Sequence, residues 1–438
     1  MTARLHLVAP EAPHASPSRP GAAPLLDAVV TYPAGQPFPV TSTATHDLAA
    51  HWQHYGDRPQ ATGRAGPQLI DTIEHLALAG RGGGYFPTAA KWRAHLRAGG
   101  GGVVVANGAE SEPASAKDAA LLQLRPHLVL DGLACAAEAV GAHSTIVWLH
   151  AGAHASHASM VRAIAERRRA GLVEPDVRIA VGPERYLSGE SSAIMRALAG
   201  GPALPEFRRV PGTGNGVPTL VHNIETLART ALAVRPGAPL RTPTSLLTVA
   251  TAAGRAVVEV AGTTPLWQVL DGILGLGATA AQQAVLLGGY GGAWIDRSTF
   301  EQLRADEASA RSLGVSLGAG VLLPLHRESC GLAQTSAIAD YLATGSARQC
   351  GPCLFGLRAV ADGLAELVEL RARRRDARRL QHVLAEISGR GACHHPDGAV
   401  RMVASALRAF AEDVRAHLHG TGCQHDGIGG FFPVPAGP

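Results

Sequence analysis

The sequence lacks the features that mark membrane, secreted and nucleic-acid-binding chains. Aromatic residues make up only 4% of the 438 residues. No run of about eighteen uncharged apolar residues occurs, and the first residues contain Pro and His instead of a continuous apolar segment. We therefore expect neither a membrane span nor a secretory signal, and predict a cytoplasmic protein. The net charge is only +4, with both signs spread along the chain, so nucleic acid is not expected as a partner.

Disulfides are also not expected, although six cysteines are present. Cellular thiol buffers keep cysteine pairs of a cytoplasmic chain reduced. We therefore interpret clustered cysteines first as metal ligands. Cys135 lies in an apolar helical pattern and is expected to be a small buried residue.

The hydrophobic patterns predict an α/β fold with several units, since 438 residues exceed one ordinary core. Strands rich in β-branched residues alternate with helical patterns up to about residue 230, which predicts a parallel-sheet α/β domain. The order strand, strand, helix, strand then predicts a small α+β module of the β-grasp kind, and three apolar-periodic segments predict a C-terminal helical bundle. The expected boundaries are a disordered N-terminal tail at 1–24, the α/β domain at 25–235, the β-grasp module at 240–300, the bundle at 325–420 and a C-terminal tail at 421–438.

One run of basic residues interrupts the bundle pattern at 371–379. We interpret it as a solvated helix end or loop. The alternative is a surface that docks an acidic redox partner.

The most distinctive segment is a Gly-rich turn that runs into a helix, Gly80-Arg-Gly-Gly-Gly-Tyr-Phe-Pro-Thr-Ala-Ala-Lys91. Glycines let the backbone approach a phosphate or a ring, helix N-terminal amides offer donors, and Lys91 adds a cation. The spacing matches neither the Rossmann fingerprint nor a P-loop. A Gly-rich loop without a ligand is the alternative interpretation.

Three further segments place polar groups where strands end or helices begin. Asn107-Gly-Ala-Glu110-Ser-Glu112-Pro follows a strand directly, at the edge where α/β sheets bind ligands. Tyr186-Leu-Ser-Gly189-Glu190-Ser191 and His222-Asn223-Ile-Glu225 precede helices. The alternatives are a solvated turn for the first segment, a helix cap at Glu190 and local backbone hydrogen bonds at His222 and Asn223.

Together and in this order, the four segments resemble the NADH-binding flavoprotein component (F type) of respiratory complex I. Its relatives in NAD-linked hydrogenases and formate dehydrogenases share them. The similarity runs from about residue 76 to residue 417, and the second module is similar to the family's SLBB domain. The resemblance implies a flavin-dependent NAD(P)H oxidoreductase, an enzyme in which hydride passes directly from the nicotinamide to FMN. Single electrons then leave through an iron-sulfur cluster, and no catalytic side chain is required.

The resemblance also assigns site residues. It gives flavin contacts to Gly80, Arg81, Gly82, Gly83, Lys91, Asn107, Glu110, Tyr186, Gly189, Glu190, His222 and Asn223. It gives NAD(P)H contacts to Phe86, Glu112 and Ser191. The chain departs from the family pattern where Ala109 replaces Asp, Ser191 replaces Glu and His222 replaces Asn.

The replacement at Ser191 has a physical interpretation. A carboxylate there would repel the extra phosphate of NADPH, and a hydroxyl would not. Like charges a few ångströms apart repel by about 1 to 4 kcal/mol at effective dielectric constants of roughly 80 to 20. We therefore hypothesise that the chain discriminates little between NADH and NADPH.

The cysteine cluster is the second strong signal. Cys350-Gly-Pro-Cys353 opens a helix and Cys393 lies in a Gly-flanked loop, a spacing that suits thiolate ligation of a metal or cluster. The family pattern has one more Cys, where Ala347 stands here. Three thiolates therefore remain, for a [4Fe-4S] cluster completed by another ligand (His394, His395 or an external group) or for a [3Fe-4S] cluster. A Cys₃His zinc site is the alternative.

Two other cysteines do not fit that cluster. Cys330 precedes a predicted helix of about sixteen residues, which spans roughly 24 Å, too far for a bond to the same cluster. Cys423 lies beyond the last predicted helix and faces a similar difficulty.

The resemblance further implies an electron-accepting partner: a ferredoxin, an iron-sulfur partner protein or a membrane-attached redox complex. Two other functions remain open. One is a degenerate, non-catalytic assembly or interaction subunit, suggested by Ala109, Ser191 and Ala347. The other is an FMN reductase with a zinc or empty C-terminal cysteine site.

Overall fold

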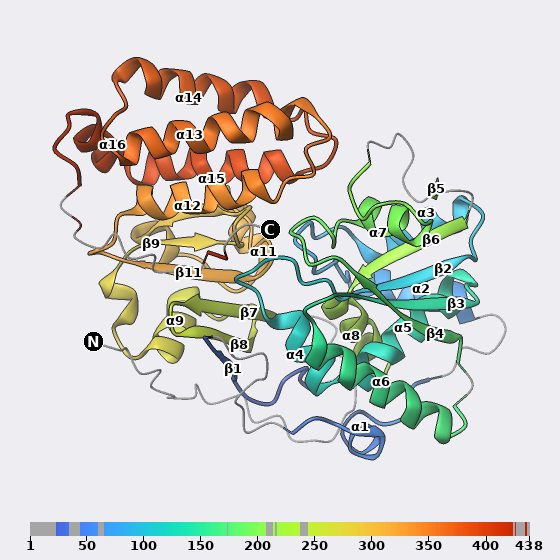
Figure 1. Cartoon of the computed structure of the whole chain (residues 1–438). Coiled ribbons are helices and arrows are strands. Elements are labelled where there is room, and N and C mark those ends of the chain that lie inside the picture. The colour runs from blue at the N-terminus through green and yellow to red at the C-terminus, as the bar shows by residue number, and fades with distance from the viewer. Residues whose placement is uncertain are drawn as a thin grey trace.

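The computed structural model describes residues 23–34, 44–59, 65–172, 174–206, 213–214, 217–236, 244–423, 425 and 434–435. The tail expected at 1–24 lies almost wholly outside the described residues, as does most of 421–438. Figure 1 shows two sheets side by side, with a layer of helices above the second sheet. The expected α/β domain, small α+β module and helical bundle are therefore confirmed.

The first sheet is mostly parallel and has the strand order β4-β3-β2-β6-β5. β2 pairs in parallel with both β3 and β6, and β3 pairs in parallel with β4. The short β5 is antiparallel to β6 at the edge. The strands are β2 (Val103–Asn107), β3 (Ser144–His150), β4 (Asp176–Gly182), β5 (Thr213–Gly214) and β6 (Val217–Asn223).

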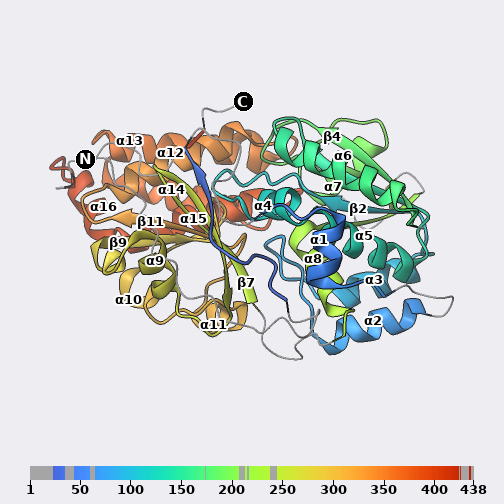
Figure 2. The same ribbon diagram turned by 90° about the horizontal axis from the view of Figure 1, so that it is seen from below.

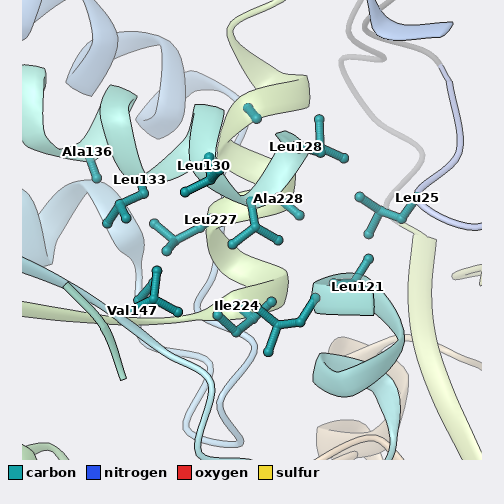
Figure 3. Packing of buried hydrophobic residues seen from close by; sticks show 14 of the residues in the cluster. Leu25, Leu121, Leu128, Leu130, Leu133, Ala136, Val147, Ile224, Leu227 and Ala228 are labelled. Atoms are coloured by element: carbon teal, nitrogen blue, oxygen red, sulfur yellow. The ribbon is translucent and has the colours of Figure 1, made fainter. Parts of the chain in front are cut away.

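Helices cover both faces of this sheet, and alternate residues of its strands point to opposite faces, so neighbouring residues of one strand are buried on different sides. Val104 and Ala106 pack into the main core with α5 and α8, whereas Val105 between them packs against α7 on the other face. Figure 3 shows leucines of α5 meeting α8 above the sheet. The helices of this half are α1 (Leu48–Tyr55), α2 (Ala65–His75), α3 (Thr88–Arg97), α4 (Lys117–Leu124), α5 (Pro126–Val140), α6 (His154–Arg169), α7 (Ser191–Leu198) and α8 (Ile224–Ala233).

A glycine lets the two central helices α5 and α8 touch. A Cβ added at Gly132 would lie 1.8 Å from the carbonyl oxygen of Leu227, so any larger residue would push the helices apart. Cys135, one turn further along α5, is fully buried, as expected of a small apolar side chain.

The second sheet has the order β1-β8-β7-β11-β9-β10. All its pairings are antiparallel except that of β11 with β7. Helix α9 packs on one face, where Leu270 and Ile273 meet Leu247. The elements are β1 (Val30–Pro33), β7 (Thr244–Thr251), β8 (Gly254–Ala261), α9 (Leu266–Leu274), η2 (Ala278–Ala281), β9 (Gln282–Leu287), β10 (Ala293–Asp296), α10 (Arg297–Phe300), α11 (Glu307–Ser312) and β11 (Val321–His326).

The N-terminal strand differs from the expected domain boundaries. We placed residues 25–235 in one domain, but β1 pairs with β8 and so belongs to the second sheet. Seen from below in Figure 2, the blue N-terminal segment crosses from helix α1 to the second sheet. A four-residue strand whose partner is more than 200 residues away leaves no periodic signal in the sequence.

The helical bundle covers the other face of the second sheet. Leu286 and Leu323 of that sheet share one core with Leu332, Leu364 and Met402 of the helices. The basic run at 371–379 covers a loop and the start of α14, as interpreted, but the helix that continues to Ile387 was not expected as a separate element. The elements are α12 (Gly331–Thr344), the π-helical turn η3 (Pro352–Gly356), α13 (Leu357–Val368), α14 (Arg374–Ile387), α15 (His395–Ala409) and α16 (Ala411–Leu418). Among the residues that the structure describes, no helix has the length and apolar character needed to span a bilayer.

Candidate functional site

The Gly-rich loop is a closed turn between α2 and α3. Its ends are joined by hydrogen bonds from the Gly80 amide to the Phe86 carbonyl (2.8 Å) and from the Thr88 amide to the Leu78 carbonyl (2.9 Å). The Arg81 amide donates to the Thr226 hydroxyl at 2.8 Å, which fixes the loop on the first turn of α8. Gly83 has a φ of 94°, a backbone conformation that favours glycine.

This loop lies against the carboxyl edge of the first sheet, where β2 and β6 end side by side. Asn107 and Asn223 are register partners at the ends of these strands. A Cβ added at Gly82 would meet the Cβ of Asn223 at 3.4 Å. The loop, the β2 end and the β6 end, which are far apart in sequence, therefore lie next to one another at this edge.

Several of the expected site residues support this edge with their own hydrogen bonds. Asn223 and Glu190 are N-caps: each side chain accepts from two backbone amides at the start of α8 and α7, respectively. Glu110 accepts from the Asp118 and Ala119 amides at the start of α4. The capping role that we weighed as an alternative for Glu190 is therefore present.

Asn107 connects this edge to the segment before α7. Its amide nitrogen donates to the Gly189 carbonyl at 2.8 Å. A Cβ on Gly189 would lie 2.6 Å from the Ala109 carbonyl oxygen, so glycine is required for this close approach. Ala109, where the family has Asp, is buried and packs with the core on the α7 side of the sheet.

A buried ion network that the sequence analysis missed lies beneath the loop. The Lys117 ammonium contacts Asp118 at 2.9 Å and Glu225 at 3.1 Å, and Asn223 donates to the other Asp118 oxygen at 2.6 Å. Burial opposes the charge of Glu225, but Lys117 and Arg229 outweigh it and lower the pKa of Glu225 to about 2. No periodic signal marks Lys117 and Asp118, because adjacent residues of a helix rarely face the same interior.

Lys91 differs from Lys117 in its surroundings. Its ammonium donates to the carbonyl of Val221, and no nearby carboxylate affects its titration among the residues described. Burial alone lowers the pKa of Lys91 to about 8. A largely buried ammonium with unused donors is suited to an anionic ligand such as a phosphate.

His222 is buried against helix α3. We expected it among the flavin contacts, and in the structure its ring is 4% exposed and its Nε2 accepts from Trp92 Nε1 at 2.7 Å. Burial holds the pKa of His222 well below its usual value, so the ring is neutral. His222 therefore supports α3 through Trp92, and its contact with flavin stays a prediction.

One cavity of about 790 Å³ joins the two halves of the molecule. Phe86, Lys91, Glu190 and Ser191 of the α/β domain line it, and Cys393 of the bundle lines it from the other side. Apolar side chains complete the wall: Leu187, Met195, Leu220, Val221 and Leu342. The volume is in the range of small-molecule and cofactor sites.

A second cavity, of about 560 Å³, shares Tyr186 with the first and is lined by Glu110 and Glu112. Glu112, expected to contact the dinucleotide, accepts from the Tyr290 amide at 2.9 Å and from the Tyr186 hydroxyl at 3.3 Å. It thereby ties the β2 edge to the turn after β9. Burial raises the pKa of Glu112 to about 7.

This raised pKa predicts a pH effect on stability. In the unfolded chain Glu112 titrates near 4.5, so between about pH 4.5 and 7 the folded state binds more protons and stability falls as pH rises. We expect the free energy of unfolding to drop by about 2 kcal/mol more in wild type than in Glu112→Gln between pH 5 and 8. Urea unfolding at both pH values measures this. If the free energy of unfolding changed equally with pH in the two proteins, Glu112 would not have a raised pKa.

The three predicted ligand cysteines lie together at the end of the bundle nearest the first sheet. Burial, with the neighbouring Cys350 and Cys393 adding to it, raises the pKa of the Cys353 thiol, and Cys350 is also close enough to raise the pKa of Cys393. Ala347, where the family has its further Cys, is half-buried. His395 directs Nε2 to the Leu342 carbonyl at 2.9 Å, and His394 is fully exposed.

Two family models match the chain, one in each half. The Nuo51 FMN-binding domain matches residues 73–231, and the iron-sulfur binding region of NADH-ubiquinone oxidoreductase F matches residues 333–417. An FMN-binding domain and an iron-sulfur domain thus meet at the large cavity. The chain is a flavoprotein of the NADH dehydrogenase type.

The chain belongs to the family of the F subunit of NADH-quinone oxidoreductase, as a divergent member. It is 24% identical to the F subunit of Rickettsia bellii strain OSU 85-389, over 80% of this chain and 90% of the relative. It is 25% identical to that of Streptomyces coelicolor, over 87% and 90%. The crystal structure of an NAD⁺-reducing [NiFe]-hydrogenase in the H₂-reduced state has the same fold, with a TM-score of 0.73 at 24% identity over 88% of this chain and 68% of that chain.

The described residues fit both cofactors of this family. The ammonium of Lys91, which no described carboxylate neutralises, suits FMN together with the Gly-rich loop and the large cavity. Three neighbouring thiols suit an iron-sulfur cluster, although one family ligand is absent at Ala347. His394, His395 or an external group stays the proposed further ligand of the cluster.

Proposed function

We propose that this chain takes hydride from NADH or NADPH onto FMN held by Lys91 and the Gly-rich loop. We further propose that the electrons leave one at a time through a cluster held by Cys350, Cys353 and Cys393 to a separate iron-sulfur protein. The observation that carries this is the shared cavity: Lys91, Phe86 and Ser191 face Cys393 across it. The residues proposed to bind the nicotinamide and the flavin therefore line the same cavity as a proposed cluster ligand.

The chain's own residues bind and orient in this proposal. Lys91 and the amides of the Gly-rich loop hold the phosphate. Phe86, whose ring is 59% exposed at the cavity, offers a face on which a nicotinamide or adenine ring stacks. The apolar side chains that line the cavity, among them Leu187 and Leu342, exclude water from the reacting rings. FMN supplies the conversion of a two-electron hydride transfer into one-electron steps.

The acceptor is proposed to dock beside the cysteine site. Phe355 is 72% exposed and Leu354 40% exposed, in the π-helical turn that contains Cys353. Large apolar side chains at such exposure next to a redox site suit a protein contact. The basic residues at the start of α14 lie at the other end of the bundle, where Arg374 contacts His419, so the docking surface rests on these apolar side chains. The proposed partner is an iron-sulfur protein such as a ferredoxin.

Steady-state oxidation of NADH tests the proposal. Protein stripped of flavin and then loaded with increasing FMN should reduce ferricyanide at a rate proportional to its FMN content. It should reduce an added acidic ferredoxin only when the cluster is present. No NADH oxidation at full FMN occupancy would instead favour a non-catalytic assembly role.

Ser191 is expected to determine the choice of dinucleotide. It is the first residue of α7 and lines the large cavity. We expect Ser191→Glu to lower kcat/KM for NADPH at least about fivefold relative to that for NADH, because the new carboxylate would repel the 2′-phosphate by about 1 to 4 kcal/mol.

Ser191→Gln is the matched control, since it adds a side chain of the same size without the charge. It should change the ratio of the two kcat/KM values by less than threefold. If wild type already rejects NADPH as strongly as Ser191→Glu does, Ser191 does not set the preference.

A further inference from the structure

The two cysteines that do not belong to the cluster site meet each other at the far end of the bundle. Cys330 is the N-cap of α12, and Cys423 follows α16. Helix α12, fourteen residues or roughly 21 Å long, separates Cys330 from the cysteine loop that follows its other end. Figure 1 shows α16 at the end of the bundle away from the first sheet.

His417, in the last turn of α16, completes a compact set with these cysteines. The two Sγ atoms and a ring nitrogen of His417 all lie within 4.8 Å of one another. His417 Nε2 is 3.9 Å from Cys330 Sγ. Ligands of a tetrahedral zinc ion lie about 3.5 to 3.8 Å apart when Zn–S is near 2.3 Å and Zn–N near 2.0 Å.

The imidazole is oriented as a ligand would be. His417 Nδ1 donates to the Leu367 carbonyl at 3.1 Å, which leaves the lone pair on Nε2, the atom that faces Cys330. A hydrogen bond from the second ring nitrogen to a carbonyl is the usual support of a zinc-bound histidine. His417 is 5% exposed, so this orientation is held by the surrounding bundle.

A fourth position is available beside Cys423. Asp413 and His425 each have a ligand atom within 4.8 Å of Cys423 Sγ, and they contact each other at 3.4 Å. Among the residues that the structure describes, the second carboxylate oxygen of Asp413 is buried and has no hydrogen-bond partner. A buried carboxylate oxygen left unpaired is costly, and a cation nearby would remove that cost.

We propose that Cys330, His417 and Cys423 bind a zinc ion whose fourth ligand comes from the Asp413–His425 pair. Two thiolates with nitrogen or oxygen ligands in a closed site favour a structural zinc over magnesium or calcium. The site would join the start of α12, the end of α16 and the chain after it. It is separate from the cluster site, and it does not depend on the function proposed above.

Metal analysis of the full-length protein, purified without oxygen and passed through a chelating resin, tests this site. We expect about one zinc per chain in wild type, and at least a tenfold lower zinc content in Cys330→Ser and Cys423→Ser with iron and FMN unchanged. Cys135→Ala and Cys350→Ser should keep the zinc. Zinc lost from Cys350→Ser but kept in Cys330→Ser would place it at the cluster cysteines and overturn the proposal.

X-ray absorption at the zinc edge of wild-type protein tests the proposed ligands without any substitution, so it is informative even where a variant fails to fold. Two sulfur neighbours near 2.3 Å with two nitrogen or oxygen neighbours support the site. Three or four sulfurs, or no bound zinc, contradict it. A mass lower by two hydrogen atoms in the denatured, unreduced wild type, traced to Cys330 and Cys423, would show a disulfide in place of a metal site.

Asp413→Ala and His425→Ala identify the fourth ligand. The substitution that removes it should leave zinc bound but raise its exchange with a competing chelator by about tenfold to 100-fold, whereas the other should have a smaller effect. No change in exchange for either variant would overturn the assignment of the fourth ligand to this pair.

Discussion

Replacing Lys91 by alanine is expected to weaken FMN binding about 100-fold. The Lys91 ammonium is largely buried, and no carboxylate within the described part of the chain neutralises it. Two charge-assisted hydrogen bonds from such a group to a phosphate contribute about 3 kcal/mol together, which corresponds to roughly 100-fold in Kd. Isothermal titration of flavin-free protein with FMN measures the change.

Arg97→Ala is the matched control, because it removes an exposed cation from the same helix α3. It should change the Kd for FMN by less than twofold. An unchanged FMN affinity in Lys91→Ala would show that the phosphate binds elsewhere. Riboflavin, which lacks the phosphate, should bind wild type and Lys91→Ala equally.

The same lysine predicts how FMN binding varies with pH. Since burial lowers the pKa of Lys91 to about 8 in the free protein, its charge is lost above that pH. The FMN affinity of wild type should therefore fall between pH 7 and 9, and that of Lys91→Ala should not.

Replacing Cys393 by serine is expected to remove at least nine-tenths of the cluster iron while leaving FMN bound. Only three cysteines are available at this site, and a serine oxygen is a poor substitute for a thiolate ligand of iron-sulfur clusters. NADH should still reduce the flavin and ferricyanide, but the rate with a ferredoxin should fall at least tenfold. Iron and acid-labile sulfide analysis, together with the two activities, measures this.

Cys135→Ala controls for the loss of a buried cysteine, since Cys135 lies in α5 and not in the bundle. It should keep the wild-type iron content. Full iron and full ferredoxin activity in Cys393→Ser would exclude Cys393 as a ligand. The serine variant keeps the side-chain volume nearly constant, so a general packing defect is not expected.

Local patterns predicted much of this molecule. The strands at 103–107 and 144–150 and the turn before α3 are visible in the sequence because β-branched runs and glycines act over a few residues. The segment Asn107–Pro113 was expected at the carboxyl edge of the sheet because it follows a strand directly, and it does follow β2 there. The detailed roles of the site segments were harder to predict: a carboxylate before a helix, such as Glu190, suits either a ligand or a cap, and here it caps α7.

Contacts between distant segments could not be predicted in this way. The length of α12 correctly separated Cys330 from the cluster cysteines, but nothing local indicates that α16 returns His417 and Cys423 to the start of that helix. The pairing of β1 with β8 was missed for the same reason. Helix α14 was missed because its apolar stripe of Leu380, Leu384 and Ile387 follows a run of arginines.

Anaerobic titration of the FMN-loaded protein with NADH tests directly whether the nicotinamide reduces the bound flavin. We expect the chain to take up one FMN, and about one equivalent of NADH per chain to bleach the flavin absorbance before any acceptor is added. A protein that takes up no FMN, or whose bound flavin stays oxidised in excess NADH and NADPH, would contradict this expectation.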